Sequence, residues 1–298
     1  MTGQEDGRTS SSTGGPTGAG GPTGPGPAGP TKEMVERLFD GSAAAYDRTG
    51  PSVFGRFGAR LAGLVPLAPG SQVLDVAAGN GAVLLPVARR LGRDGQVTGI
   101  DLSSGMLREA GRAAEAEGLA NVRLLRMDAE HLEFPDEFFD AVFCAHGVFL
   151  FPDRQAALRE MYRVTKPGGY AGVSIFGNTP PAFTPAWGML VEQLTAYGVG
   201  VRVPDPLAYY TPQEMETLLR EAGFRSIETL SEATDVVYVD PDDWWGFLLT
   251  MAPRPAILSM GEPARARFKK EYLDLLRPLF RADGLHLAVS MVYATARR

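Results

Sequence analysis

Apolar positions along this chain fall into two alternating patterns. From Ser71 onward, short apolar runs alternate with longer segments in which apolar residues recur at helical spacing. The short runs predict strands over 72–76, 96–100, 121–127, 138–145 and 169–176. The segments between them predict helices over about 81–92, 103–117 and 152–165. Strands separated by helices of this length are typical of a parallel sheet with helices on both faces.

The rhythm changes after the fifth predicted strand. Residues 181–198 predict an inserted helical piece. The run Thr211-Pro212-Gln213-Glu214 has the pattern of a capping box with proline at the first helical position, and Gly223 is expected to end that helix. Three further elements are predicted, which are a strand over 224–239, a helix from Asp240-Pro241 and a strand from Leu285 to Thr295.

The first 30 residues differ from the rest in composition. They are almost all Gly, Pro, Ser, Thr and Ala, and such a segment buries too little apolar surface to offset its ordering entropy. We therefore expect a disordered tail over 1–30 and one folded domain over 31–298. Within it, two apolar stretches at helical spacing, at 34–39 and 53–65, predict an N-terminal helical lid over 31–70. The helical insertion over 180–222 is expected to cap a substrate.

Charge and cysteine content narrow the class of protein. The chain has 298 residues, 44% of them hydrophobic, and a formal net charge of −6, which argues against nucleic acid as a partner. Apolar runs stay well short of the roughly 20 residues that cross a bilayer, so no membrane partner is expected. The N-terminus lacks a signal-peptide pattern, and the single cysteine, Cys144, fits a reducing compartment. These features predict a cytoplasmic protein.

Three acidic residues follow successive predicted strands. Asp75 ends the first strand and runs into the turn Ala77-Ala78-Gly79-Asn80-Gly81, while Asp101 and Asp128 follow the second and third. The acids are 26 and then 27 residues apart, close to the roughly 30 residues of one strand–helix–strand unit. All three should therefore lie at the carboxyl edge of the sheet, where open α/β sheets bind ligands.

The spacing of these residues distinguishes between nucleotide ligands. Dinucleotide sites use G-x-G-x-x-G, whereas this chain has D-x-x-x-G-x-G. An acid at Asp75 suits a cationic amine, although it is equally placed to cap the turn. Asp101 is placed to accept hydrogen bonds from ribose hydroxyls, and Asp128 with the Ala129 amide is placed to hold an adenine. Adenine, ribose and an amino-acid head together describe S-adenosylmethionine.

At this point the chain resembles the class I S-adenosylmethionine-dependent methyltransferases, in the branch with the ubiquinone/menaquinone-biosynthesis C-methyltransferases and bacterial natural-product methyltransferases. The matching stretches are 73–81, 99–103, 128–130, 138–142 and 163–169. The resemblance implies a Rossmann-like, doubly wound, mostly parallel seven-stranded sheet with an antiparallel last strand. It also implies S-adenosylmethionine as cofactor, which leaves as S-adenosylhomocysteine.

The resemblance also assigns cofactor-binding residues. Gly79 and Gly81 would hold the methionyl part, Asp101 the ribose, and Asp128 with Ala129 the adenine. Met106 would pack on the adenine. The chain departs from the family motif at Ala77, where glycine is common. The neighbours expected to complete this site are Asp75, Ala77, Leu102 and Ala145.

Candidate catalytic residues lie near the expected methyl group. His146 follows the fourth strand and is the first candidate for a base or an orienting group, the alternative being a residue that only packs. Tyr46 matches a tyrosine of the family's N-terminal lid and could line the methyl channel or pack within its helix. His286 and His131 are expected to face solvent. No metal site is expected, because the acids are assigned to the cofactor.

Aromatic residues are concentrated in the later half of the chain, where the acceptor should be chosen. The candidates for the substrate pocket are Trp187, Trp244, Trp245 and Tyr209. We expect a small, largely apolar acceptor of the aromatic or prenylated natural-product class, with C-methylation slightly favoured over O-methylation. N-methylation of an indole or amine, a cyclase or isomerase on the same fold, and a nucleotide-dependent oxidoreductase are the alternatives. Self-association into a homo-oligomer is left open.

Overall fold

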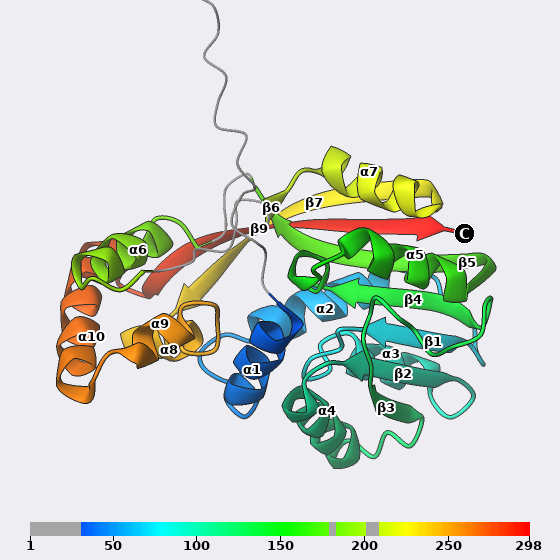
Figure 1. Ribbon diagram of the computed structural model, residues 1–298, viewed down its shortest axis with the longest axis horizontal. Coiled ribbons are helices and arrows are strands. Elements are labelled where there is room, and N and C mark those ends of the chain that lie inside the picture. Colours follow the sequence, from blue (N-terminus) through cyan, green and yellow to red (C-terminus); the bar gives the residue numbers. More distant parts are fainter. Residues whose placement is uncertain (1–30, 179–182, 201–208) are drawn as a thin grey trace, which may run out of the picture.

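The computed structural model describes residues 31–178, 183–200 and 209–298, the side chain of Tyr209 excepted (Figure 1). The predicted tail over 1–30 lies outside these residues, as do the first residues of the helix predicted over 181–198. In the described part, no helix is both long and apolar enough to cross a membrane.

The strands form one mixed sheet in the order β3-β2-β1-β4-β5-β9-β7. Strands β1 to β5 pair in parallel, whereas β9 runs antiparallel between β5 and β7. This confirms the predicted doubly wound sheet with an antiparallel last strand. Two short strands that the sequence did not predict are attached to it, β6 beside β5 and β8 beside β9. The bounds are β1 Gln72–Val76, β2 Gln96–Asp101, β3 Val122–Arg126, β4 Phe139–Ala145, β5 Thr165–Gly177, β6 Tyr209–Tyr210, β7 Arg225–Tyr238, β8 Phe280–Arg281 and β9 Gly284–Arg297.

Two apolar cores lie on opposite faces of the sheet, which explains why the central strands are apolar throughout. Helices α2 (Val53–Leu64) and α3 (Leu84–Leu91) contribute to one core, and α5 (Arg154–Val164) and α7 (Pro212–Ala222) contribute to the other. Helix α4 (Ser104–Ala116) begins at the N-cap predicted from the sequence, because the Ser103 hydroxyl accepts a hydrogen bond from the Met106 N–H. The short helix η1 (Val148–Leu150) follows β4.

Helix α1 (Lys32–Ser42) lies over the carboxyl edge of the sheet, next to α4. Lys32, Glu36 and Asp40 share one helix face by their four-residue spacing. Glu36 pairs with Arg126 at 2.5 Å, and the Asp40 carboxylate accepts hydrogen bonds from the Ser103 hydroxyl and the Gly105 N–H. These contacts join α1 to the ends of β2 and β3.

A separate group of helices gathers at one end of the long β7–β9 pair, far from β1–β3 (Figure 1). It comprises α6 (Ala186–Ala196), α8 (Pro241–Leu248), α9 (Arg254–Ser259) and α10 (Glu262–Leu276), with η3 (Arg277–Leu279) after it. The two helices of the predicted 180–222 insertion therefore lie in different places. Helix α6 contacts α10, whereas α7 packs on β7 and α5 as part of the layer over the sheet.

Candidate active site

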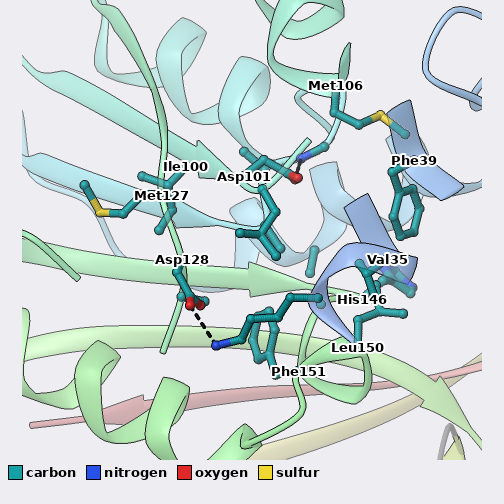
Figure 2. Close-up of a pocket in the computed structure, with 18 of the residues that line it drawn as sticks. Val35, Phe39, Ile100, Asp101, Met106, Met127, Asp128, His146, Leu150 and Phe151 are labelled. Carbon is teal, nitrogen blue, oxygen red and sulfur yellow. Dashed lines mark hydrogen bonds and ion pairs between the residues drawn. The ribbon is translucent and has the colours of Figure 1, made fainter. Parts of the chain in front are cut away.

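A cavity of about 870 Å³, its open mouth included, lies at the carboxyl ends of β1, β2, β3 and β4. Figure 2 shows Val35 and Phe39 of α1 across the cavity from Asp101 and Asp128 at the strand ends. The structure brings the two predicted catalytic residues, His146 and Tyr46, to this cavity. It also places here the following predicted cofactor residues: Ala77, Gly79, Asp101, Leu102, Met106, Asp128, Ala129 and Ala145.

Asp101 holds the glycine turn in place. One carboxylate oxygen accepts a hydrogen bond from the Gly79 N–H at 2.9 Å, and the other accepts one from the Ser103 N–H at 2.8 Å. Burial raises the pKa of Asp101, and these N–H donors oppose that shift. The turn is left-handed at both Ala77 (φ 55°) and Gly79 (φ 54°), which explains why glycine would suit position 77. A Cβ at Gly79 would meet no atom within 4 Å, so the turn leaves open space there.

Asp75 and Gly81 do not line the cavity. Asp75 is 1% exposed and receives a hydrogen bond from the Leu84 backbone at the start of α3, while its Oδ2 has no partner among the described residues. Burial raises the pKa of Asp75 to about 8. This arrangement favours the capping interpretation over a contact with the cofactor amine. Gly81 has a φ of 100° and supports the turn by its backbone conformation.

A cation faces the predicted adenine residues. The Lys32 Nζ lies 2.7 Å from Asp128 Oδ2 and also pairs with Glu130, and all three side chains line the cavity. Burial alone would raise the pKa of Asp128, but hydrogen bonds from Lys32 and the Glu130 N–H lower it. Lys32 was not identified as a site residue from the sequence, because a lysine in the first turn of a surface helix carries no signal of its own.

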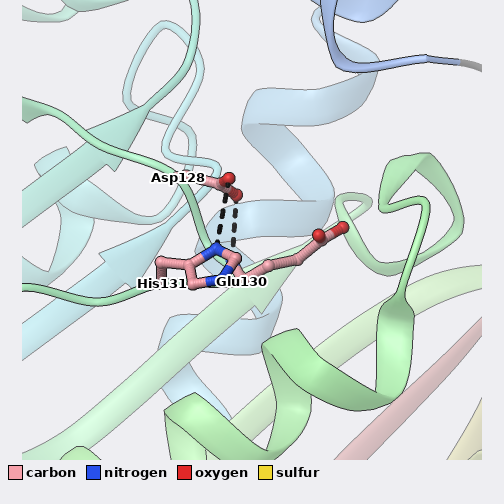
Figure 3. A group of neighbouring side chains, drawn as sticks. All are labelled: Asp128, Glu130 and His131. Carbon is pink, nitrogen blue, oxygen red and sulfur yellow. Dashed lines mark hydrogen bonds and ion pairs between the residues drawn. The ribbon is translucent and has the colours of Figure 1, made fainter.

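Asp128, Glu130 and His131 bring ligand-type atoms within 4.8 Å of one another (Figure 3). The Lys32 ammonium already contacts both carboxylates, and the His131 side chain is 82% exposed. The cluster is therefore explained by its ion pairs and carries no metal assignment.

His146 lies at the other end of the cavity in an aromatic environment. Its ring makes edge contacts with Phe54 and Phe176 at centroid distances of 5.2 and 5.0 Å, and its Nε2 lies 3.5 Å from the Met291 sulfur. Burial lowers the pKa of His146 to about 3, so the imidazole is neutral at physiological pH. Its φ of 56° lies in the left-handed region, which few residues other than glycine adopt.

Tyr46 joins the N-terminal segment to both ends of the cavity. Its ring stacks on Phe54 at 5.1 Å and meets the edge of Phe39 at 5.8 Å. Its backbone carbonyl accepts a hydrogen bond from the Asn80 side chain in the glycine turn. Desolvation raises the pKa of the Tyr46 hydroxyl, which therefore stays protonated. The sequence did not single out Phe54, although Phe54 lies in the helical stretch predicted over 53–65.

The three tryptophans predicted for the substrate pocket do not line this cavity. Trp244 is fully buried and donates its Nε1–H to the Tyr272 hydroxyl, and Trp245 packs against Phe268. Trp187 packs against the same apolar core, and the Tyr209 side chain lies outside the described residues. His286 pairs with Asp235 and Asp283 instead of facing the cavity.

The donor set fits S-adenosylmethionine. Asp101 and Asp128 offer carboxylate oxygens from neighbouring strand ends, Ala129 lines the cavity beside them, and the open turn at Gly79 lets a ligand approach the backbone. The loss of Asp75 from the lining leaves this set intact.

Comparison with known proteins supports the same cofactor. The family profile described as a methyltransferase domain matches residues 73–169. The chain is 37% identical over 161 residues to aklanonic acid methyltransferase DauC of Streptomyces sp. (strain C5). The aligned region covers 52% of this chain and 73% of that protein. It is also 33% identical over 208 residues to nocamycin O-methyltransferase of Saccharothrix syringae. That alignment covers 65% of this chain and 74% of that protein.

Solved structures share the fold. The crystal structure of the [4+2]-cyclase SpnF aligns with a TM-score of 0.58 at 24% identity, over 91% of this chain and 97% of that one. At this identity the likeness shows the fold alone. The profile match, the two relatives and the cofactor geometry agree, and this chain belongs to the class I S-adenosylmethionine-dependent methyltransferases.

Proposed function

We propose that this methyltransferase acts on a phenol or enol of a small, largely apolar natural product, of the aromatic or prenylated class. The observation that carries the proposal is the uneven distribution of charge along the cavity. The charged lining residues are Lys32, Asp101, Asp128 and Glu130, all at the end assigned to the adenosine. The other end, which we call the acceptor end, is formed by Tyr46, Phe54, Ala145, His146 and Gly147.

The acceptor end favours a neutral, protic molecule. An ammonium or a carboxylate would lose its water there without a countercharge from the described part of the chain. A hydroxyl needs only one hydrogen-bonding partner, and His146 and Tyr46 supply neutral ones. The apolar rings around them would accommodate a flat acceptor.

Different residues of the cavity would have different roles in methyl transfer. When bound, S-adenosylmethionine supplies an electrophilic methyl group. Asp101, Asp128 and Ala129 would hold its adenosine, and the rings of Tyr46 and Phe54 would exclude water. His146 has a pKa of about 3 and is a weak base, so we propose that it orients the acceptor hydroxyl without ionising it beforehand and takes up the hydroxyl proton as the methyl group is transferred.

Oxygen is the first candidate for the methylated atom, because a neutral imidazole can accept the hydrogen of a hydroxyl. The relative named as an O-methyltransferase is compatible with this choice. In a phenol or enol the carbon beside the hydroxyl-bearing carbon is also nucleophilic. C-methylation, which the sequence analysis slightly favoured, is therefore the second candidate. We also propose residues 31–70 as the lid, since α1 and Tyr46 cover the cavity.

The test is incubation with S-adenosylmethionine and a panel of phenols, prenylated quinols, indoles and aromatic carboxylic acids, followed by mass spectrometry. We expect a product heavier by one methyl group from a phenol or quinol. A product of unchanged mass would instead indicate cyclisation or isomerisation. Methylation restricted to carboxylic acids or indoles would contradict the proposed acceptor class.

A further inference from the structure

A cluster of aromatic rings continues from the acceptor end of the cavity into the protein. Phe54 lines the cavity and also stacks on Phe247 of α8, with ring centroids 6.3 Å apart. Phe247 in turn contacts Phe183, Trp244 and Tyr238 at 5.2, 5.5 and 5.7 Å. The cluster therefore reaches from His146 to the end of β7, and Phe54 separates it from the cavity.

Tyr238 carries an unusual polar group within this cluster. Its side chain is fully buried, and its hydroxyl has no hydrogen-bond partner among the described residues. Such a group usually destabilises a fold by about 1–3 kcal/mol, and native proteins keep few of them. Burial raises the pKa of the hydroxyl, so it remains a neutral group that can both donate and accept.

A second buried tyrosine, Tyr272, has a fully hydrogen-bonded hydroxyl next to the same indole ring, that of Trp244. The Tyr272 hydroxyl accepts a hydrogen bond from Trp244 Nε1 at 2.9 Å and donates one to the Ala186 carbonyl at 3.0 Å. Tyr238 also touches Trp244, with ring centroids 5.2 Å apart, but its hydroxyl makes no such bonds. The packing of the region therefore does not by itself account for the Tyr238 hydroxyl.

We propose that Tyr238 recognises the methyl acceptor. Its hydroxyl hydrogen-bonds an oxygen at the end of the acceptor remote from the methylated atom, and the rings of Phe54 and Phe247 pack along the ring system between. The acceptor class is a flat aromatic molecule with oxygen functions at opposite ends. Phe54 must turn aside to admit it, because its ring stands between the cavity and the cluster. This assignment rests on the proposed function and adds to it a determinant of acceptor specificity.

The first test compares two variants that each remove one buried hydroxyl, Tyr238→Phe and Tyr272→Phe. Tyr238→Phe removes a group without a partner, so its melting temperature should equal or exceed that of the wild type. Tyr272→Phe leaves the Trp244 N–H unpaired and should lower the melting temperature. A loss of stability in Tyr238→Phe as large as that in Tyr272→Phe would overturn the proposal, because the hydroxyl would then have a structural partner.

The second test uses two probes, 2,6-dihydroxynaphthalene and 2-naphthol, titrated into protein saturated with S-adenosylhomocysteine. The wild type should bind the diol about fivefold to tenfold more tightly than the mono-ol, and Tyr238→Phe should bind both equally. Affinity for S-adenosylhomocysteine should be the same in both proteins. A wild type without this preference, or a variant that keeps it, would overturn the proposal.

These results are independent of turnover. A wild type that shows the preference for the diol but transfers no methyl group would contradict the proposed function and still support the role of Tyr238 in binding. Methyl transfer to phenols without the preference would contradict the role of Tyr238 alone.

Discussion

The two ends of the cavity are built in different ways. At the adenosine end, Asp101 is held by backbone N–H groups of Ser103 and of Gly79 in the glycine turn, and Asp128 is held by the Glu130 N–H and by Lys32. At the acceptor end, His146 is surrounded by rings from α2 and β5 and by the Met291 sulfur of β9. The cofactor would thus be recognised by polar groups held locally at strand ends, whereas the acceptor would be selected by side chains brought together from distant segments.

The largest expected effect is that of Asp101→Ala on cofactor binding. The change removes the proposed acceptor for the ribose and also the carboxylate that holds the Gly79 and Ser103 N–H groups. We expect a loss of about 2 kcal/mol or more, which corresponds to a roughly 30-fold or larger rise in Kd for S-adenosylhomocysteine. Calorimetric titration measures it.

A matched control is available at the opposite edge of the sheet. Asp140 also accepts a backbone hydrogen bond, from the Gln72 N–H at 2.8 Å, and pairs with Lys166. Asp140→Ala should lower the melting temperature while leaving the affinity for S-adenosylhomocysteine unchanged. An equal loss of affinity in both variants would mean that Asp101 acts through stability alone.

The next effect, at the acceptor end, is that of His146→Asn on turnover. Asparagine tolerates the left-handed backbone at this position and removes the imidazole. We expect turnover to fall by about tenfold to hundredfold because the acceptor is no longer oriented, with affinity for S-adenosylhomocysteine within about twofold of the wild type. His286→Asn, outside the cavity, is the control and should retain turnover.

The pH profile of the wild type provides a further check on His146. A pKa lowered to about 3 means that the imidazole stays neutral as the pH falls from 8 to 5. The turnover number should therefore show no acidic limb near pH 6.5 due to this residue. An acidic limb there that disappears in His146→Asn would show an ordinary histidine acting as a base.

Asp75→Asn should affect stability with a distinctive dependence on pH. The pKa of Asp75 is raised from 3.8 to about 8 in the fold, so the folded state binds more protons than the unfolded state between these values. Stability of the wild type therefore falls as the pH rises from about 4 to 8, whereas the neutral amide avoids this loss. The melting temperature of the variant should exceed that of the wild type by more at pH 8 than at pH 5. An equal difference at both pH values would show that Asp75 ionises normally.

The smallest effect is that of Lys32→Met on cofactor affinity. The Lys32 ammonium contacts the Asp128 carboxylate that would accept the adenine amine, so its removal should relieve a competition. The two side chains of this ion pair are 30% and 29% exposed, so we expect affinity for S-adenosylhomocysteine to rise by up to about fivefold and to depend less on salt. Glu36→Gln breaks another ion pair on the same helix face and should change nothing, whereas weaker binding in Lys32→Met would show that the lysine assists the cofactor.

The residues of the proposed adenosine end could be grouped from the sequence because their signals are local. Asp101 and Ser103, or Asp128 and Ala129, are neighbours in the chain, and the strand periodicity places them at one edge. Helix boundaries marked by Ser103 and Thr211 were also predicted, because each cap bonds to its own first turn.

The acceptor end could not be predicted in the same way. The exclusion of Trp244 from the cavity depends on its hydrogen bond to Tyr272, which lies 28 positions further along the chain. Helix α9 was missed because its six residues are too few to show a helical period. Helix α10 was missed because charged residues recur through 262–277 and weaken the apolar pattern, although Pro263 near its start was a usable signal. Long-range packing of this kind leaves no local pattern.

The most direct test of this contrast is titration of S-adenosylhomocysteine into the wild type, Asp101→Ala and His146→Asn, with NAD as the comparison ligand. We expect the wild type and His146→Asn to bind S-adenosylhomocysteine alike, Asp101→Ala to bind it at least about 30-fold more weakly, and NAD not to bind. Binding of NAD in place of S-adenosylhomocysteine, or affinity that falls with His146 and not with Asp101, would contradict it.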